Sequence, residues 1–204
     1  MTNPTLLYCA PFTCTVAVRI ELARLELPHE TRHVSRGPAR QVPDDALAAL
    51  NPMRKVPTLV LPDGEVLTEM VAVLLHLDES TTQRAPAERR RLVNWLAFVA
   101  TELHKMVLAP AFDPETPDES IADARDRLLP PVLAHVESHL AASPFLMGAD
   151  PCGVDAYLLW ALLLLRFRWP EAVDTPALTR FRRAMLAFPH VPPILADERA
   201  RLGM

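Results

Sequence analysis

Cys14 is the residue of this 204-residue chain whose type and position best suit nucleophilic chemistry. It precedes Val16, Ile20, Ala23 and Leu27, which are apolar and at helical spacing, so we expect it at the N-terminus of a helix. Free backbone N–H groups and the helix dipole favour a thiolate there. A thiol of lowered pKa suits a nucleophile or a mixed-disulfide partner. The alternative is a small core residue, since free cysteine is often buried.

The residues around this thiol have simpler interpretations. Cys9 lies within a predicted strand, where buried packing is expected, although a Cys9–Cys14 disulfide stays open as an alternative. Tyr8 is either a core aromatic or a hydroxyl that stabilises a thiolate. The cysteines number three, an odd count, and the first residues lack the basic start of an export signal. We therefore expect reduced thiols in the cytoplasm.

Composition argues against several other functions. The net charge is −4, from 21 basic and 25 acidic residues, which offers no positive surface for nucleic acid. The longest apolar run, from Ala156 to Leu165, is half of the about 20 residues that a bilayer crossing needs. We therefore expect neither a nucleic-acid partner nor membrane insertion.

Phosphate-binding turns and metal sites are not expected either. The chain has only 5 glycines and lacks the Gly-x-Gly-x-x-Gly pattern. His135 and His139 are four residues apart on a predicted helix, which suits a metal, but no third ligand is evident in the sequence. A helix surface is the better interpretation of this pair.

The elements that must position Cys14 alternate between strand and helix at first, and helices alone follow. Strands are predicted near residues 5–9, 30–34, 56–61 and 65–67, and helices near 16–27, 44–50 and 69–77. Later helices are expected at 87–109, 119–142, 152–168, 177–187 and 191–200, with a kink or break at Pro130-Pro131. This pattern divides the chain into an α/β domain (1–79), a linker (80–86) and an all-helical domain (87–204).

Several stretches connect this layout with a known family. Residues 51–59 read Asn-Pro-Met-Arg-Lys-Val-Pro-Thr-Leu, and Asp63-Gly64 and Leu67-Thr68-Glu69 follow them. Residues 95–105 read Trp-Leu-Ala-Phe-Val-Ala-Thr-Glu-Leu-His-Lys, and residues 152–158 read Cys-Gly-Val-Asp-Ala-Tyr-Leu. With the loop at residues 10–15, they resemble the glutathione S-transferase superfamily, most closely its bacterial beta class. The resemblance implies an α/β thioredoxin-like N-terminal domain followed by an all-α C-terminal domain.

The resemblance also implies roles for individual residues. Cys14 would contact the glutathione sulfur, and His104 would donate a hydrogen bond to the thiolate. Val56, before a cis bond to Pro57, would pair through its backbone with the cysteinyl part of the peptide. The remaining binding groups would be the Glu69 carboxylate for the α-amino group, the Met70 N–H for the α-carboxylate, Lys55 for the glycyl carboxylate, and Lys105.

Each implied role has a structural alternative. Pro57 could be an ordinary edge-strand proline. Glu69 could be a favourable acid in the first turn of a helix. His104 could be a structural histidine, and Lys105 could belong to a solvated helix face.

The chain also departs from the family pattern. Phe12 and Arg54 stand where glycine is usual, Met70 replaces serine or glycine, and Ala97 replaces asparagine. Cys152 replaces the serine or threonine of a helix cap whose partner, Asp155, we expect to be structural. The loop at residues 35–43 lacks the usual lysine, for which Arg36 or Arg40 could substitute.

Together, the residues and the resemblance predict a cytoplasmic glutathione S-transferase. The glutathione thiolate would attack an apolar electrophile, or Cys14 would exchange thiol and disulfide as in a thiol oxidoreductase. Candidate contacts of the electrophile are Phe12, Met106, Val107 and Ala111. The family further implies a two-fold dimer and a role in detoxification. The departures favour an alternative, a non-enzymatic relative that binds a ligand or a partner protein.

Overall fold

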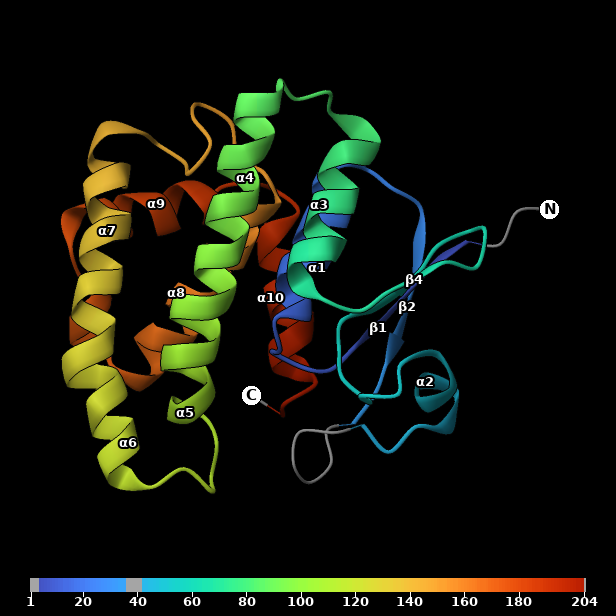
Figure 1. Cartoon of the computed structure of the whole chain (residues 1–204), viewed down its shortest axis with the longest axis horizontal. Coiled ribbons are helices and arrows are strands. Elements are labelled where there is room, and N and C mark those ends of the chain that lie inside the picture. Colours follow the sequence, from blue (N-terminus) through green and yellow to red (C-terminus); the bar gives the residue numbers. More distant parts are fainter. Residues whose placement is uncertain (1–3, 36–41, 204) are drawn as a thin grey trace. The chain divides into compact units, whose positions relative to one another are not determined.

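The computed structural model describes residues 4–35 and 42–203, which form two compact units (Figure 1). The first unit comprises residues 1–83 together with 189–204, and the second comprises residues 84–188. From the sequence, residues 87–204 are expected in one helical domain, whereas in the structure residues 189–204 group with the first unit. Helix α10 (Val191–Ala200) packs against α1 (Thr15–Arg24), and its buried Glu198 pairs with Arg19.

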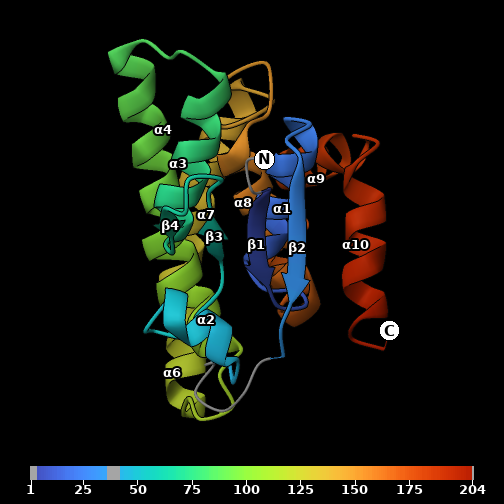
Figure 2. The ribbon, with the colours of Figure 1, turned by 90° about the vertical axis from the view of Figure 1, so that its right-hand side faces the viewer.

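A four-stranded sheet in the order β2-β1-β3-β4 forms the centre of the first unit. Strand β1 (Thr5–Cys9) runs parallel to β2 (His29–His33) and antiparallel to β3 (Thr58–Val60). Strand β4 (Val66–Leu67) is antiparallel to β3. Figure 2 shows β1 and β2 side by side. The turn before β4 contains Gly64, whose φ of 92° is the left-handed backbone that glycine allows. All four strands lie where the sequence predicts them.

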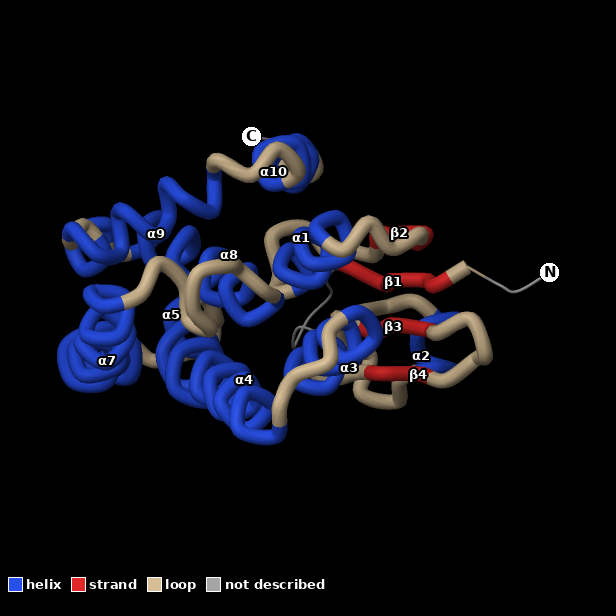
Figure 3. The backbone as a smooth tube through the Cα atoms, turned by 90° about the horizontal axis from the view of Figure 1, so that it is seen from above, coloured by secondary structure: helices blue, strands red, loops and turns tan. Residues whose placement is uncertain are grey.

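Helices cover both faces of this sheet. Helices α1 and α3 (Met70–Thr81) lie on one face and α2 (Asp45–Leu50) lies on the other (Figure 3). Successive side chains of β1 point to opposite faces, so both faces require a cover. Tyr8 packs beside Leu47 of α2. Helix α2 begins where the Asp44 carboxylate accepts the Leu47 N–H at 2.9 Å, a cap that the sequence predicts.

The second unit is helical in the part that the structure describes. Its first segment consists of α4 (Pro86–Phe98), η2 (Val99–Leu108) and α5 (Ala109–Ala111), and its second of α6 (Asp118–Asp123), η3 (Ala124–Leu128) and α7 (Leu129–Ala142). Helix α8 (Gly153–Arg168), the short 3-10 turn η4 (Pro170–Val173) and α9 (Pro176–Leu186) complete the unit. Helix α8 contains the long apolar run of the sequence and buries 11 of its 16 residues.

Two of these segments are wound as π-helix where the sequence predicts ordinary α-helix. They are η2 and η3, and each directly precedes prolines: Pro110 in α5, and Pro130 with Pro131 at the start of α7. Each proline lacks the N–H that would bond a carbonyl one turn earlier, so the preceding turn loses part of its α-helical pairing. The predicted disturbance at Pro130-Pro131 is therefore a change of winding.

The helical segment Pro86–Ala111 is long and apolar enough, by length and composition alone, to cross a membrane. This segment was not singled out from the sequence, because charged residues interrupt its apolar residues. Its apolar side chains Leu92, Leu96, Val99, Leu103 and Val107 are buried. Core helices of helical proteins have the same length and composition, so the feature is weak evidence for a membrane.

Candidate functional site

Cys14 stands directly before α1, as the sequence predicts. It is the N-cap residue, with φ −56° and ψ −14°. Its side chain is 6% exposed, and its thiol faces the Val56 carbonyl oxygen at an Sγ–O distance of 3.9 Å. The thiol is therefore covered, as a core cysteine would be, and it also lies at the positive end of the α1 dipole.

Two threonines fix the loop that leads to Cys14. The Thr13 hydroxyl donates to the Ala10 carbonyl at 2.8 Å and lies 2.7 Å from the Thr15 hydroxyl. The backbone closes the same turn, since the Thr13 N–H also donates to the Ala10 carbonyl. Hydroxyl side chains often bond nearby backbone in this way, so the Thr-Cys-Thr sequence itself carried the signal for this turn.

The segment before β3 places a second backbone edge close to Cys14. The Val56–Pro57 peptide bond is cis, as the resemblance implies. Asn51, 3% exposed, holds this segment: its side-chain amide donates to the Lys55 carbonyl and to the Thr58 hydroxyl, both at 3.0 Å. Asn51 belongs to the family stretch at residues 51–59, but no role for its side chain is predicted from the sequence. An asparagine directly before Pro52 is common in turns, and that was the available signal.

Glu69 and Met70 lie at the start of α3, as predicted. Glu69 is the exposed N-cap residue, and Met70 is the first residue of the helix. The Met70 side chain is only 5% exposed and belongs to the hydrophobic core. From the sequence, a methionine here would add bulk beside a ligand. In the structure the side chain is instead covered by protein. The first N–H groups of α3 are the kind that bind a carboxylate.

Phe12 and Arg54 replace family glycines without changing the backbone that glycine favours. Their φ angles are 52° and 51°, both in the left-handed region. Residues with a Cβ adopt this region at a cost, so other contacts must hold them there. The Arg54 N–H donates to the Asn51 carbonyl and the Arg54 carbonyl accepts from the Val42 N–H. The Phe12 N–H donates to the carboxylate of Glu198 at 2.7 Å.

Other predicted residues of the first unit vary in their setting. Lys55 is exposed beside Val56. Tyr8 is 3% exposed, with the Arg32 guanidinium 5.3 Å above its ring, which favours the core-aromatic interpretation. Arg36 and Arg40 lie outside the described residues.

Cys9 is free and buried. Its Sγ lies 3.3 Å from His33 Nδ1, and burial raises the pKa of its thiol to about 12. Cys14 is in no disulfide either, so the structure does not contain the alternative Cys9–Cys14 bond.

In the second unit, His104 lies on the π-helical segment η2. Its Nδ1 is 2.6 Å from the hydroxyl of Tyr157, which is fully buried in α8. The Trp160 ring packs edge-on against the imidazole at a centroid distance of 4.7 Å. π-Helical turns are frequent at functional sites, and a hydrogen bond on one ring nitrogen selects the tautomer of the other. Sequence reasoning missed Tyr157, which was assigned only to the core helix.

The remaining candidates of the second unit divide by exposure. Lys105 is exposed and Met106 is 48% exposed, whereas Val107 and Ala111 are buried at 0% and 7%. Val107 is therefore a core residue rather than a surface contact for an electrophile. Asp155 is structural, as expected.

His135 and His139, the pair with metal-compatible spacing that the sequence assigns to a helix surface, lie in an aromatic cluster. The Trp95 ring stacks on His135 at a centroid distance of 5.0 Å and meets His139 edge-on at 4.9 Å. His135 is exposed, so the expected helix surface holds for it, whereas His139 is half-buried beside Trp95. Within the described ranges, 4–35 and 42–203, histidine, cysteine and carboxylate side chains form no group of three placed to hold a metal.

The fold and the first unit's site define a thioredoxin-like protein with a cysteine at the start of its first helix, a cis-proline beside it and an appended helical unit. The family model described as "Glutathione S-transferase, N-terminal domain" matches residues 13–80. The model described as "Glutathione S-transferase, C-terminal domain" matches residues 99–189. The chain belongs to the glutathione S-transferase family.

Individual relatives agree with this assignment. Glutathione S-transferase GstA from Escherichia coli O157:H7 is 34% identical over 173 residues, which cover 82% of this chain and 83% of that protein. A sphingomonad glutathione S-transferase solved in complex with glutathione is 29% identical, with a TM-score of 0.78 over 95% of this chain and 98% of its own. The bacterial beta-class enzyme from Sphingomonas chungbukensis is 27% identical, with a TM-score of 0.79 over the same shares, 95% and 98%.

Proposed function

We propose that this chain is a glutathione transferase of the bacterial beta class. Its first unit binds the tripeptide, and the glutathione thiolate attacks the electrophilic carbon of an apolar substrate and displaces its leaving group. The observation that carries the proposal is the Cys14 thiol, held at the start of α1 and 3.9 Å from the Val56 carbonyl. The family match and the glutathione-bound relative support the same co-substrate.

Backbone and side-chain groups of the first unit bind glutathione in this proposal. The Val56 N–H and C=O pair with the cysteinyl part of glutathione, as one more strand at a sheet edge would. The Glu69 carboxylate receives the α-amino group, the Met70 N–H receives the α-carboxylate, and Lys55 reaches the glycyl carboxylate. Because the Met70 side chain is buried, the difference from serine that matters at this position is the missing hydroxyl.

His104 and Lys105 contribute from the second unit. When the Tyr157 hydroxyl donates to Nδ1, the neutral imidazole carries its proton on Nε2, which can then donate to a thiolate. The protein acts in the cytoplasm as a two-fold dimer, without a metal and without membrane or nucleic-acid partners. Its role is detoxification.

A second candidate is thiol–disulfide exchange, favoured by the fact that Cys14 is a cysteine outside any disulfide, at the start of α1. In that reaction the Cys14 thiolate attacks one sulfur of oxidised glutathione. A Cys14–glutathione disulfide forms, and one glutathione thiolate leaves. A mass increase of one glutathionyl group on Cys14 after treatment with oxidised glutathione would support this candidate. No adduct would exclude it.

The deciding experiment is calorimetric titration with reduced glutathione, with thermal unfolding as a check. A ligand that binds only the folded state adds about 2.7 kcal/mol at about 100 times its Kd. We expect saturable binding, and loss of turnover with an aromatic halide electrophile in Cys14→Ala. The Tyr8→Phe variant tests the other thiol activator and should retain turnover if Tyr8 is a core aromatic. No binding at millimolar glutathione would instead favour the non-enzymatic alternative.

A further inference from the structure

The loop that carries Cys14 is anchored by a residue from the far end of the chain. Phe12 has a left-handed backbone (φ 52°), which a residue with a Cβ adopts only under restraint. Its N–H donates to Oε2 of Glu198, 186 residues later, at 2.7 Å. The restraint on Phe12 therefore comes from helix α10 as well as from the turn itself.

Glu198 is built into the first unit as a buried charge. Its side chain is fully buried, and its other carboxylate oxygen accepts a hydrogen bond from Arg19 of α1. Burial alone lowers the pKa of Arg19, but its bonds to Glu198 and Asp197 outweigh this and raise it above its ordinary value. A buried carboxylate needs such a cation, and its bond to an N–H is stronger than a neutral one.

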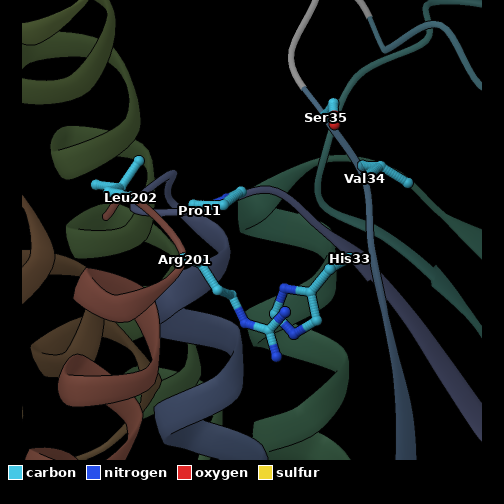
Figure 4. Close-up of a pocket in the computed structure, with 6 residues that line it drawn as sticks. All are labelled: Pro11, His33, Val34, Ser35, Arg201 and Leu202. Carbon is cyan, nitrogen blue, oxygen red and sulfur yellow. The ribbon is translucent and has the colours of Figure 1, made fainter. Parts of the chain in front are cut away.

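The neighbourhood of this anchor can be followed in Figure 4. Pro11, in the loop before Cys14, lies near Leu202, and the Arg201 side chain extends towards His33. These residues line a pocket of about 420 Å³ with Val34 and Ser35. The end of α10 and the segment that follows it thus border the Cys14 loop.

We propose that Glu198 is a positioning residue for Cys14. Through the backbone of Phe12 it fixes the loop at residues 10–14, so that the thiol stays at the N-terminus of α1 for its reaction. This role rests on the proposed function of Cys14, and it adds the hydrogen bond that keeps the Cys14 loop in place. It also explains how this chain tolerates phenylalanine where relatives have glycine, because the bond to Glu198 holds the backbone that glycine would adopt freely.

Glu198 does not act by its charge in this proposal. A carboxylate near a thiol would disfavour the thiolate and raise the thiol pKa. If charge were the whole effect, removing Glu198 would lower the pKa of Cys14. If position is the effect, releasing the loop moves the thiol away from the helix N-terminus and raises that pKa.

Three variants and one control separate these effects. Glu198→Gln keeps an acceptor for Phe12 and removes the charge, whereas Glu198→Ala removes both. Glu198→Ala also takes the fully buried partner from Arg19 and could unfold the protein. Arg19→Met combined with Glu198→Leu therefore removes the acceptor and both charges of this pair together. Asp197→Ala is the matched control, since Asp197 also pairs with Arg19, at 2.8 Å, but the anchoring bond to Phe12 belongs to Glu198.

Two measurements do not need glutathione turnover. One is the hydrogen exchange of the Phe12 amide. The other is the pH–rate profile of Cys14 with a neutral pyridyl disulfide, corrected with Cys14→Ala. We expect at least tenfold faster exchange and a raised thiol pKa in Glu198→Ala and in the double variant. Glu198→Gln and Asp197→Ala should keep the slow exchange, and neither should raise the pKa.

The proposal is overturned if Phe12 exchange is unchanged in the folded double variant, or if exchange accelerates while the Cys14 profile stays that of the wild type. A lowered pKa in both Glu198 variants would instead assign a purely electrostatic role. If the wild type fails to bind glutathione, the proposed function is wrong, but the comparison of Phe12 exchange and Cys14 pKa among the variants still tests the role of Glu198. The two failures are therefore distinguishable.

Discussion

Each unit of this protein contains a fully buried carboxylate that fixes the backbone beside a helix start, but the two are held differently. In the second unit, Asp155 accepts N–H groups from Leu146 at 2.8 Å and Cys152 at 3.0 Å, nine and three residues away. In the first unit, Glu198 accepts from Phe12, 186 residues away, and pairs with Arg19. A local carboxylate is satisfied by its own turn, whereas a distant one requires a cation and a complete fold.

The largest effect is expected from separating Glu198 from its cation. Glu198→Leu removes the fully buried partner of Arg19 and leaves this part-buried guanidinium paired with Asp197 alone, which should cost about 3–5 kcal/mol of unfolding free energy. Adding Arg19→Met should recover most of that loss, because the pair is then replaced by apolar side chains. Urea unfolding of the wild type, both single variants and the double variant measures the coupling. Additive losses would show that the two residues are not coupled.

Asp155→Ala tests the local carboxylate. It leaves the N–H groups of Leu146 and Cys152 without this acceptor, each at a cost of about 1–2 kcal/mol, so we expect a loss of about 2–4 kcal/mol. Unlike the loss at Glu198, this loss should not be recovered by replacing a nearby arginine or lysine. Asp155→Asn, which keeps one acceptor oxygen, should lose less. Equal losses for alanine and asparagine in urea unfolding would contradict the role of the two backbone bonds.

Tyr157→Phe removes a single hydroxyl in the same helix as Asp155. The free energy of unfolding should fall by about 1 kcal/mol, since one buried hydrogen bond to His104 is lost. The proton of neutral His104 should shift from Nε2 towards Nδ1, which ¹⁵N NMR of the imidazole resolves. The resonances of His33 in the first unit serve as the internal reference. An unchanged His104 tautomer would show that Tyr157 does not select it.

The smallest effect is expected from mild acid, and it should fall on the first unit. Burial, with Arg201 and Arg19 next, lowers the pKa of His33, and burial, with Arg24 next, lowers that of His190. Below the ordinary histidine pKa of about 6.5, the unfolded chain therefore binds more protons than the folded chain. Stability should fall as the pH drops from about 7 to 5. Thermal unfolding across this range checks the sign, and His33→Gln should reduce the slope.

The difference between the two carboxylates also explains which features the sequence could predict. Asp155 follows a recognisable cap position at Cys152, so its role could be read from spacing of three residues. The position of Cys14 and the strands around it likewise follow from local patterns, and the cis bond at Pro57 from the family resemblance. These features depend on neighbours in the chain or on a motif.

Glu198, Tyr157 and the domain boundary could not be predicted in this way. Glu198 resembles any acid on an amphipathic helix until α10 is placed against α1. Tyr157 reads as a core aromatic until the hydroxyl is seen 2.6 Å from His104. Both depend on pairs far apart in sequence, for which periodicity and capping rules carry no information.

The return of α10 to the first unit also sets an order of assembly during synthesis. Residues 84–188, which form the second unit, are continuous in sequence, whereas the first unit is interrupted by them. Because synthesis runs from the N-terminus, the strands and helices of residues 5–81 have been made long before Glu198 is added. The loop of Cys14 receives its distant anchor only after that. Newly made chains therefore pass through a stage in which the sheet of the first unit is present and its thiol loop is not yet fixed.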